Sequence, residues 1–487
     1  MVGGGGSGLA AAVSAAEHGA SVLVLEKQRQ LGGTTGIAVG SFTACVTKLQ
    51  RRAGAQDELE HHVEDAGRFA PEAIEARNNT ELRRFFLAHS AETLDWLQGM
   101  GLRFSGPYPE PPNRQPRMHN VVPGAKAYIA TLHARLLRLG GQVLCSASVV
   151  ELSKEGDRVT GVVALIDGSR QLFTARRGVV LAAGDYAGAA DLIARFKGEE
   201  FTVVEGINPR ATGDGHRLAQ QAGAKLLNMD ITYGPELRFV PPPGRTWQQV
   251  LPARGPLAWL LSRTLPHVPR FVLGALIRRL LVTWRHPEDA LFRDGAILVN
   301  SLGQRFCDET LSPARELAAA MQPGKVCYIL LDERLVDRYS RWPHFVSTAP
   351  KIAYAYVADY LRLRRDIAVQ AASLDDLARQ RHLPAGTLRE TVAQANAQAA
   401  AASQPPLSGN RWVLLGPAKA YFTTTEGGAA INQRFEVLDE TGQPIAGLYA
   451  VGQNGLGGQI LWGHGLHIAW AITSGRLLGR QLSESVQ

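Results

Sequence analysis

Residues 1–27 read MVGGGGSGLAAAVSAAEHGASVLVLEK, and this stretch decides the fold. Glycines spaced as G-x-G-x-x-G run from Gly3 to Gly8, and a helix of small residues follows them. Such a turn lets the backbone and a helix N-terminus come close to a pyrophosphate. The apolar run Ser21–Leu25 then reads as a strand ending at Glu26, where a carboxylate accepts hydrogen bonds from a ribose. Turn, helix, strand and acid in this order predict a dinucleotide-binding βαβ unit.

The start of this unit is unusually short. Only Met1 and Val2 precede the first glycine, although a βαβ unit begins with a strand. We therefore expect a weakened first strand, either because the strand is very short or because the chain begins late relative to the natural protein.

Composition and charge limit the classes of protein and partner. The 487 residues suffice for two or more domains, and the hydrophobic content of 45% is typical of a globular protein. The net charge of +8 favours anionic partners, a membrane surface included. No nucleic-acid motif accompanies that charge, so we expect no nucleic-acid partner.

The four cysteines are scattered, without a Cys-x-x-Cys pair or a Cys/His cluster. We therefore expect neither a metal site nor a disulfide framework, and a reducing compartment. No signal peptide and no run of about 20 apolar residues is visible in the sequence. The predicted location is the cytoplasm, with the inner face of the membrane as a further place of contact.

Further glycine turns extend the nucleotide site. LGGTTG at 31–36 offers amides and hydroxyls, and LAAGDYAG at 181–188 closes a buried strand with a second glycine turn. Asp214 either caps the helix after ATGDG or reaches the cofactor, and Val150 either touches an adenine or is a plain strand residue. The candidate cofactor ligands are Gly3, Gly5, Gly6, Ser7, Gly8, Glu26, Lys27, Gly33, Thr34, Thr35, Val150, Ala183, Gly184, Asp214, Gly452, Gln453, Gly465 and Leu466.

Mixed secondary structure is expected between these turns. Leu82–Leu102 has apolar residues at helical spacing and predicts an amphipathic helix. The prolines of Ser105–Arg117 block both helix and central strand and predict a loop of the kind that lines active sites. The pattern predicts another helix over 124–139 and an antiparallel patch inserted in the nucleotide-binding domain, with strands over 142–152, 159–165 and 172–175.

The composition changes between Glu236 and Glu288, where no Asp or Glu occurs. Residues 251–287 combine arginines with apolar residues, and the clean apolar run Phe271–Ile277 is too short to span a bilayer. This segment predicts either a helix lying in a membrane interface or an amphipathic helix packed on the protein's own core.

Regular elements are also predicted in the C-terminal half. They are a hairpin over Asp294–Glu309, a strand over Val326–Leu331, a helix over Ser373–Ala402, strands over Trp412–Tyr421 and Leu448–Val451, and a last helix over Gly465–Leu478.

These pieces resemble the fumarate reductase/succinate dehydrogenase-type flavoproteins, a group that includes the 3-ketosteroid dehydrogenases. The matching motifs lie in order along nearly the whole chain: GGGGSGLAAA, GGTTG, SAETLDWL, LAAGDYAG, TGDG, ILVNSLGQRFCDE, EGGAAIN and GLYAVGQ. The resemblance implies bound FAD, an α/β Rossmann-type FAD-binding domain that is discontinuous, and an inserted α+β cap that closes on a substrate. It also implies hydride transfer at a carbon next to an activating carbonyl.

Departures from the family pattern separate its members. The histidine that fumarate reductases carry before the glycine pair is replaced here by Thr424, Thr425 and Glu426, and the C-terminal loop GQNGLGGQILWGHGLH lacks their arginine. Their proton-relaying cap arginine is matched only by Arg315, at a spacing off by two. A dicarboxylate site needs several cations, so the resemblance is closest in character to the ketosteroid dehydrogenases.

The apolar C-terminal loop favours a hydrophobic substrate. His464 is expected near a substrate carbonyl, and Tyr108 and Tyr421 are candidate proton-transfer phenols. The predicted function is FAD-dependent dehydrogenation or enone reduction of a hydrophobic, ketosteroid-like molecule. The alternative is a membrane-peripheral reductase of the fumarate type that acts on an unsaturated acid or passes electrons to quinone.

The expected domain order follows from these assignments. The FAD-binding domain takes residues 1–228 and 413–487, the cap takes 229–350 and a helical segment takes 351–412.

Overall fold

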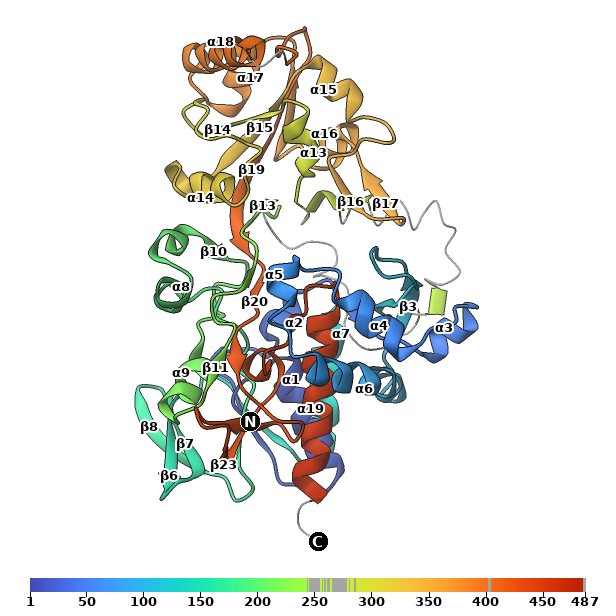
Figure 1. Cartoon of the computed structure of the whole chain (residues 1–487), viewed down its shortest axis with the longest axis vertical. Coiled ribbons are helices and arrows are strands. Elements are labelled where there is room, and N and C mark those ends of the chain that lie inside the picture. Colours follow the sequence, from blue (N-terminus) through green and yellow to red (C-terminus); the bar gives the residue numbers. More distant parts are fainter. Residues whose placement is uncertain are drawn as a thin grey trace.

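The chain forms a body, which contains both termini, and a cap. The cap lies at the other end of the long axis of the molecule (Figure 1). The computed structural model describes residues 1–242, 244, 255, 257, 260, 263–264, 278–279, 281–283, 286–401 and 404–484. Most of the basic segment at 251–287 lies outside these residues, so its two interpretations are untested. No helix in the described residues is both long and apolar enough to cross a membrane.

A parallel sheet forms the centre of the body. β1 (Leu23–Leu25) pairs with β5 (Gln142–Leu144), and β9 (Val179–Leu181) pairs with β23 (Pro444–Ala450), each in parallel. Val2 joins the two pairs through single parallel bridges to Leu25 and Leu181. The prediction of a weakened first strand is confirmed, because that strand is reduced to this bridging residue.

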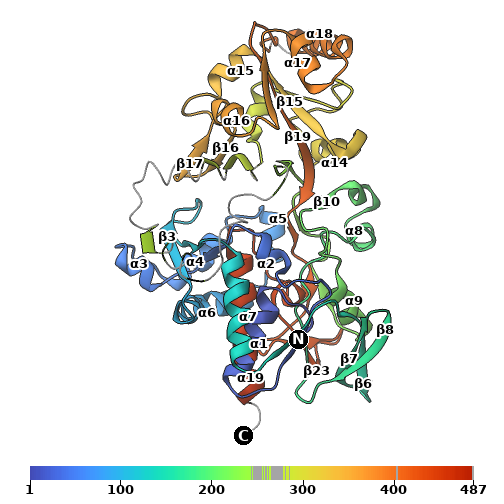
Figure 2. The same ribbon diagram turned by 180° about the vertical axis from the view of Figure 1, so that it is seen from behind.

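Three helices cover this sheet side by side, namely α1 (Gly6–Glu17), α7 (Lys126–Arg138) and α19 (Leu466–Glu484) (Figure 2). Small residues let α1 and α19 come close together, since a Cβ at Gly475 would lie 2.3 Å from the carbonyl oxygen of Ser7. The chain's first helix and its last therefore form one layer.

The predicted antiparallel patch is present on the other side of the body, as β6 (Ser148–Glu155), β7 (Arg158–Ile166) and β8 (Ser169–Thr174) in the order β6-β7-β8. The prediction of one strand over 142–152 is wrong. The chain leaves the parallel sheet after β5 and turns at Ser146, whose φ of 56° is incompatible with a continuous strand.

A small sheet and several helices form the side of the body that faces the cap. The sheet has the order β2-β4-β3, with β2 (Ser41–Thr43), β3 (Arg103–Tyr108) and β4 (Met118–Val122). The prediction that all of Ser105–Arg117 is a loop is wrong, because β3 extends to Tyr108. Its proline at 107 is tolerated because the pairing with β4 shifts register between Ser105 and Tyr108. The helices here are α2 (Gly33–Ile37), α3 (Lys48–Arg52), α4 (Leu59–Ala66), α5 (Glu72–Glu75) and α6 (Thr80–Gly99), the predicted amphipathic helix.

The cap has a core of its own, drawn from residues between Leu237 and Ala418. The segments expected as cap (229–350) and helical segment (351–412) thus share one core, while the exact boundaries remain a prediction. Its central strand β19 runs on from the cap into the body (Figure 1). The strands of this sheet are β10 (Glu205–Gly206), β13 (Glu236–Phe239), β14 (Ile297–Val299), β15 (Cys327–Leu331), β18 (Ala368–Ala371) and β19 (Trp412–Phe422).

Two cap predictions need correction. The hairpin over Asp294–Glu309 has only its first arm as a strand, β14, and a single bridge joins Val299 to Arg305. The helix over Ser373–Ala402 is two helices, α17 (Leu374–Arg381) and α18 (Ala385–Ala401). They separate at His382, whose φ is 55°, just before Pro384.

The remaining described elements connect these layers. They are α8 (Ala190–Phe196), α9 (Asp214–Gln221), α13 (Asp289–Arg293), α14 (Ala314–Ala320), α15 (Glu333–Arg338), α16 (Val357–Leu363), and the short strands β11 (Leu226–Leu227), β12 (Thr232–Tyr233), β16 (Ser347–Ala349), β17 (Ala353–Ala355), β20 (Thr424–Thr425), β21 (Gly428–Ala429) and β22 (Glu436–Leu438).

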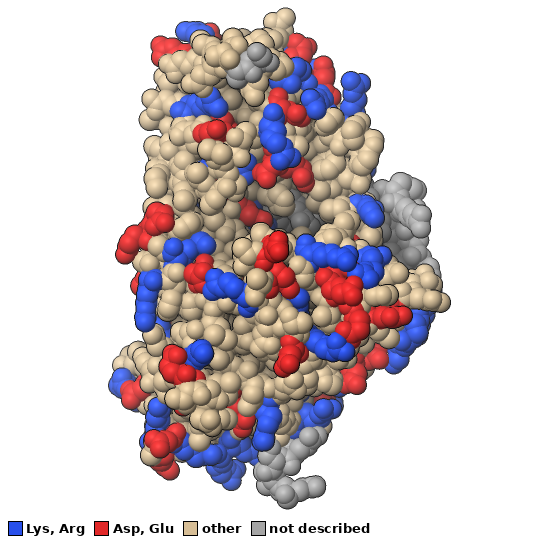
Figure 3. Space-filling model, in the orientation of Figure 1, with Lys and Arg blue, Asp and Glu red and all other residues tan. Residues whose placement is uncertain are grey.

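Basic and acidic side chains are interspersed over the face shown in Figure 3, which does not gather the net positive charge into one patch.

Candidate functional site

The N-terminus of α1 forms the first part of the site. Gly5 is the N-cap of α1 and no side chain caps it, so the first amides of the helix keep their donors for an anion. A Cβ at Gly5 would have its nearest neighbours, at Gly32 and Gly33, 3.9 Å away, whereas a Cβ at Gly8 would lie 2.0 Å from the carbonyl oxygen of Gly3. Gly8 therefore serves packing, whereas the backbone at Gly5 has more room around it.

The acid at the end of β1 lies beside this turn. Glu26 is buried, and its carboxylate accepts hydrogen bonds from the amides of Gly4 (2.8 Å) and Gln28 (2.8 Å). A carboxylate has further lone pairs, which are available to the hydroxyls of a ribose. Lys27 is different, because its Nζ lies 2.7 Å from Asp214, and the two side chains neutralise each other.

The second glycine turn faces the same region. A Cβ at Gly184 would meet no atom within 4 Å, so this turn also borders open space. Asn454 fixes the turn, since its amide accepts from the N–H of Ala183 (2.6 Å) and donates to the carbonyl of Gly184 (2.9 Å). Val150 lies in the middle of β6, and its contact with an adenine stays a prediction.

The N-terminus of α19 contributes a polar cluster. Gln453 donates to the Thr424 hydroxyl (3.0 Å) and lies 3.1 Å from the Nδ1 of His467. The Nε2 of His467 lies 3.0 Å from the fully buried carboxylate of Glu426. Gly452, Gly465 and Leu466 are backbone neighbours of this cluster.

Thr34 and Asp185 extend the polar lining beyond that cluster. Thr34 accepts a hydrogen bond from Asn208 (2.9 Å) and donates weakly to Asp185 (3.5 Å). Burial raises the pKa of Asp185 to about 6. Thr35 does not face this group, because its side chain packs on Gly6, where a Cβ would meet its hydroxyl at 2.6 Å.

A cavity of about 330 Å³ lies between the cap and the body. Its described walls are mostly apolar and aromatic, with two carboxylates and one imidazole among them. The lining residues are Phe69, Pro109, Glu110, Pro111, Met118, Tyr233, Gly234, Glu236, Ala349, Pro350, Ile352, Trp462 and His464. Body and cap thus both contribute to one pocket, as in a site that closes on its ligand.

The titratable side chains of the cavity are organised around His464. Its Nδ1 and its backbone N–H both bond to one oxygen of Glu110, the latter at 2.9 Å. From the cap side, Glu236 forms an ion pair with Arg238 at 2.7 Å. Burial opposes ionisation of Glu236, but the charges of Arg238 and of nearby histidines outweigh it, and its pKa lies below the ordinary value.

The other catalytic candidates do not line the cavity in the described residues. Tyr108 ends β3, one residue before the lining starts at Pro109. Tyr421 lies opposite Glu236 in the β13–β19 pair, and burial raises its pKa to about 12. Arg315 is buried within the cap, where it pairs with Glu316 and Asp289 (2.9 Å). Their roles remain predictions.

The functional residues that sequence reasoning passed over are Glu110, Glu236, Trp462, Tyr233, Asn454 and His467. Glu110 follows the singled-out Tyr108-Pro109, so the proline-rich loop was a usable signal. No signal in the sequence indicated Glu236 or Tyr233, because these residues reach the site through the pairing of β13 and β12 with distant strands.

Fold and site together define a two-domain α/β protein that binds a dinucleotide on its body and a second ligand under its cap. Residues 1–242 and 279–459 match the family model described as FAD binding domain. The chain belongs to this family, and its cofactor is FAD. The residues present fit that group, because Gly184 borders open space, the α1 amides are uncapped and Glu26 keeps acceptor capacity.

Relatives support the predicted flavoprotein group. The vinyl phenol reductase of Lactiplantibacillus plantarum is 26% identical over 516 residues, which cover 99% of this chain and 96% of that protein. The NADH:fumarate oxidoreductase of Klebsiella pneumoniae is 26% identical over 508 residues, which cover 99% of this chain and 47% of that protein. The chain thus spans about half the length of the Klebsiella protein.

Solved structures confirm the predicted fold. A flavocytochrome c3 fumarate reductase in its open conformation has a TM-score of 0.73 at 23% identity, covering 99% of this chain and 77% of that one. The 3-ketosteroid delta1-dehydrogenase from Sterolibacterium denitrificans has a TM-score of 0.64 at 19% identity, covering 99% of this chain and 98% of that one. The resemblance to the fumarate reductase/succinate dehydrogenase-type flavoproteins is therefore confirmed, as is the discontinuous FAD-binding domain with an inserted cap.

Proposed function

We propose that the chain is an FAD-dependent oxidoreductase acting on a C–C bond next to the carbonyl of a hydrophobic, ketosteroid-like substrate. The reaction is dehydrogenation or its reverse, enone reduction. The substrate occupies the cavity between cap and body.

The charge of the cavity wall carries this proposal. Its acidic and basic members are Glu110, Glu236 and His464, and no lysine or arginine is among the described lining residues. Glu236 is paired with Arg238 and Glu110 with His464, so the described wall does not present the set of cations that binds a dicarboxylate. The aromatic and proline side chains around them instead suit a neutral, apolar molecule.

The chain's own residues have distinct roles in this proposal. FAD supplies the hydride chemistry. Because Nδ1 is bonded to Glu110, His464 holds the carbonyl oxygen through Nε2–H in its doubly protonated form, and Glu110 fixes the orientation of the ring. Tyr108 and Tyr421 are the candidates for moving a proton at the neighbouring carbon after the cap closes.

Named relatives support the choice of substrates for a test. One relative is a vinyl phenol reductase and one structural neighbour was solved with 1,4-androstadiene-3,17-dione, both concerned with neutral molecules. Others are named for fumarate or acrylate, which are anions. The fumarate-type alternative is therefore one arm of the same experiment.

The test is anaerobic mixing of the purified flavoprotein with a panel of substrates while its absorbance is followed. Ketosteroids should bleach the oxidised flavin or reoxidise the dithionite-reduced flavin, and fumarate and acrylate should react more slowly. A fastest reaction with either acid would overturn the proposal. A protein without flavin absorbance, before and after addition of FAD, would do so as well.

Contact with a membrane is a separate proposal, supported by the basic and acid-free sequence between Glu236 and Glu288. Flotation with anionic liposomes, before and after Arg278, Arg279 and Arg285 are replaced by Glu, tests it. Equal flotation of the two proteins would rule out an electrostatic anchor in this segment.

A further inference from the structure

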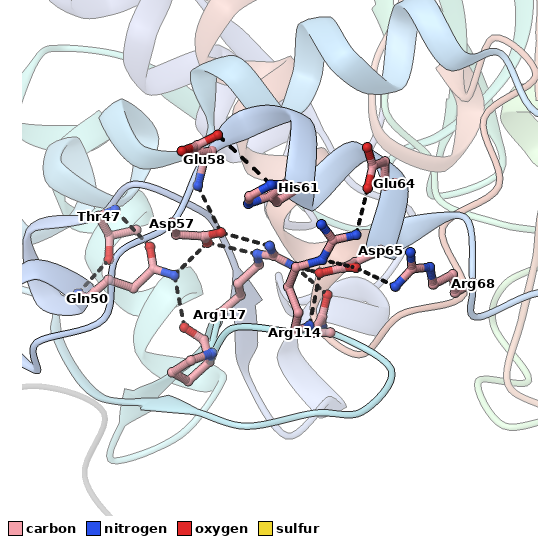
Figure 4. A network of polar contacts seen from close by, with 12 residues as sticks. Thr47, Gln50, Asp57, Glu58, His61, Glu64, Asp65, Arg68, Arg114 and Arg117 are labelled. Carbon is pink, nitrogen blue, oxygen red and sulfur yellow. Dashed lines mark hydrogen bonds and ion pairs between the residues drawn. The ribbon is translucent and has the colours of Figure 1, made fainter.

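A buried ionic cluster forms around Arg117, Asp57 and Asp65 (Figure 4). Arg117 forms a bidentate pair with Asp57, at 2.8 and 2.7 Å, and a third bond to Asp65 at 2.6 Å. All three side chains are 0% exposed. Burial opposes ionisation of Asp57, but the bonds from Arg117 outweigh it and hold the pKa of Asp57 below its ordinary value.

This cluster holds one end of the loop at several points. Arg117 also donates to the side chain of Asn113 (2.9 Å), and Arg114 bonds to Asp65 through its backbone N–H (2.9 Å). Gln50 joins Asp57 to the carbonyl of Pro116, at 2.8 and 2.9 Å. The loop is thus fixed by charged and amide groups rather than by apolar packing.

The other end of the same loop forms a wall of the cavity. Pro109, Glu110 and Pro111 line it, and Glu110 bonds to His464. The N–H of Asn113 donates to the carbonyl of Glu110 at 2.9 Å. A short path of bonds therefore leads from Arg117 through Asn113 to Glu110.

Stability alone is a weak reason for such a cluster. Taking ions out of water costs several kcal/mol each, and well-packed apolar residues commonly replace a buried ion pair without loss of stability. The planar guanidinium gives something that apolar packing lacks, namely fixed directions for three acceptors at once.

We infer that Arg117, held by Asp57 and Asp65, is a positioning residue that keeps the Glu110 carboxylate against His464. This inference deepens the proposed function and rests on it for its catalytic consequence. Lysine in place of Arg117 keeps the charge but loses the forked guanidinium that bonds to both aspartates. The loop should then become more mobile, and the Glu110 carboxylate should no longer be held against His464.

One arm of the test needs no substrate. Hydrogen exchange at the His464 amide, which Glu110 holds, is measured in the flavin-loaded wild type, Arg117→Lys, Asn113→Ala and Glu110→Ala. We expect the amide to exchange at least ~10-fold faster in Arg117→Lys and Glu110→Ala, and to a smaller degree in Asn113→Ala. Wild-type exchange in both Arg117→Lys and Asn113→Ala would overturn the inference, whatever the substrate is.

The second arm is a double-mutant cycle on turnover with the best substrate of the panel. If Arg117 acts through Glu110, Arg117→Lys lowers kcat but the Glu110→Ala/Arg117→Lys double variant is no slower than Glu110→Ala alone. If the effects of the two single substitutions on kcat multiply in the double variant, Arg117 has an independent structural role and the inference is overturned. Should Arg117→Lys fail to fold, Asn113→Ala takes its place in the cycle.

A matched control separates positioning from general loosening. Arg305 forms a similar forked pair with Glu309 in the cap and does not line the cavity. Arg305→Lys should leave the exchange of the His464 amide and the kcat as in the wild type. If the proposed substrate class is wrong, the hydrogen-exchange result still tests the role of Arg117. Failure of the proposed function and failure of this inference can therefore be told apart.

Discussion

Glu110 receives two hydrogen bonds from one residue, because the backbone N–H and the Nδ1 of His464 meet the same carboxylate oxygen. A carboxylate only accepts, so Nδ1 carries the proton in this pair. The orientation of the imidazole is therefore set from the loop at 109–118, which is distant in sequence from the α19 turn. This arrangement leads to the first prediction.

Replacing His464 with Gln should lower the rate of reaction between flavin and substrate by about 10²–10³-fold, the usual effect of removing one donor that stabilises a developing negative charge. Glu110→Gln should lower it less, by up to ~10²-fold, since the imidazole is retained but misplaced. Single-turnover stopped-flow absorbance measures both rates. His133→Gln, on α7, is the control and should react like the wild type. Unchanged rates in His464→Gln would remove this residue from the mechanism.

The two glycines at the start of α1 provide a second prediction, about cofactor binding. A Cβ at Gly5 would meet Gly32 and Gly33 only at the ordinary contact distance of 3.9 Å, so the apoprotein of Gly5→Val should fold while the pyrophosphate is blocked. Gly8→Ala brings a Cβ to 2.0 Å from a backbone oxygen. This should lower the free energy of unfolding by about 1–3 kcal/mol and also reduce the flavin content. Flavin content and apoprotein melting temperature separate the two variants. Equal melting temperatures would contradict this assignment.

The cofactor half of the site could be predicted from sequence because its parts are local. A G-x-G-x-x-G turn, its helix and Glu26 follow one another within a single βαβ unit, so spacing alone brings them together. Spacing did not predict that Lys27 pairs with Asp214, which comes from another glycine turn, and the role of Lys27 as a cofactor ligand stays a prediction.

The substrate half could be predicted only in part, because its contacts join distant segments. His464 is a predicted candidate, but its partner Glu110 is not, because the contact joins residues 354 positions apart. Arg315 matched the family pattern approximately, yet the fold encloses it with Glu316 inside the cap. Predicted strand lengths were wrong where pairing with another strand outweighed the local sequence signal, as at Pro107 in β3.

A third prediction concerns the aromatic wall of the cavity. Trp462 and Tyr233 pack edge to face with ring centroids 5.4 Å apart. Trp462→Ala removes a large apolar surface, so the Kd of a neutral ligand should rise about 10–100-fold, or ~1.4–3 kcal/mol. Difference absorbance of the bound flavin during ligand titration measures this Kd. Trp342→Ala, at an exposed residue of the cap, is the control and should bind like the wild type.

Buried histidines should control stability in acid. His62 is 1% exposed, and neither of its ring nitrogens has a hydrogen-bond partner in the described residues. Burial, with a further contribution from the charge of Arg117, lowers the pKa of His62 to about 3. His119 is equally buried and its pKa is lowered to about 4, but it has partners in Thr47 (3.1 Å) and the carbonyl of Phe42 (3.3 Å).

The unfolded chain takes up a proton on His62 near pH 6.5 and the folded chain does not, so stability should fall as the pH drops from about 6.5 toward 3. The full shift corresponds to at most about 5 kcal/mol. His62→Leu should flatten this acid limb and also stabilise the protein at pH 7.5 by ~1–3 kcal/mol, because an unpaired buried polar group is removed. His119→Leu should flatten the limb but destabilise the protein at pH 7.5, because the buried Thr47 hydroxyl loses one of its two partners and keeps only the Gln50 N–H. Urea unfolding at several pH values measures both effects, and an acid limb that is unchanged in His62→Leu would show that this histidine is hydrated or paired in solution.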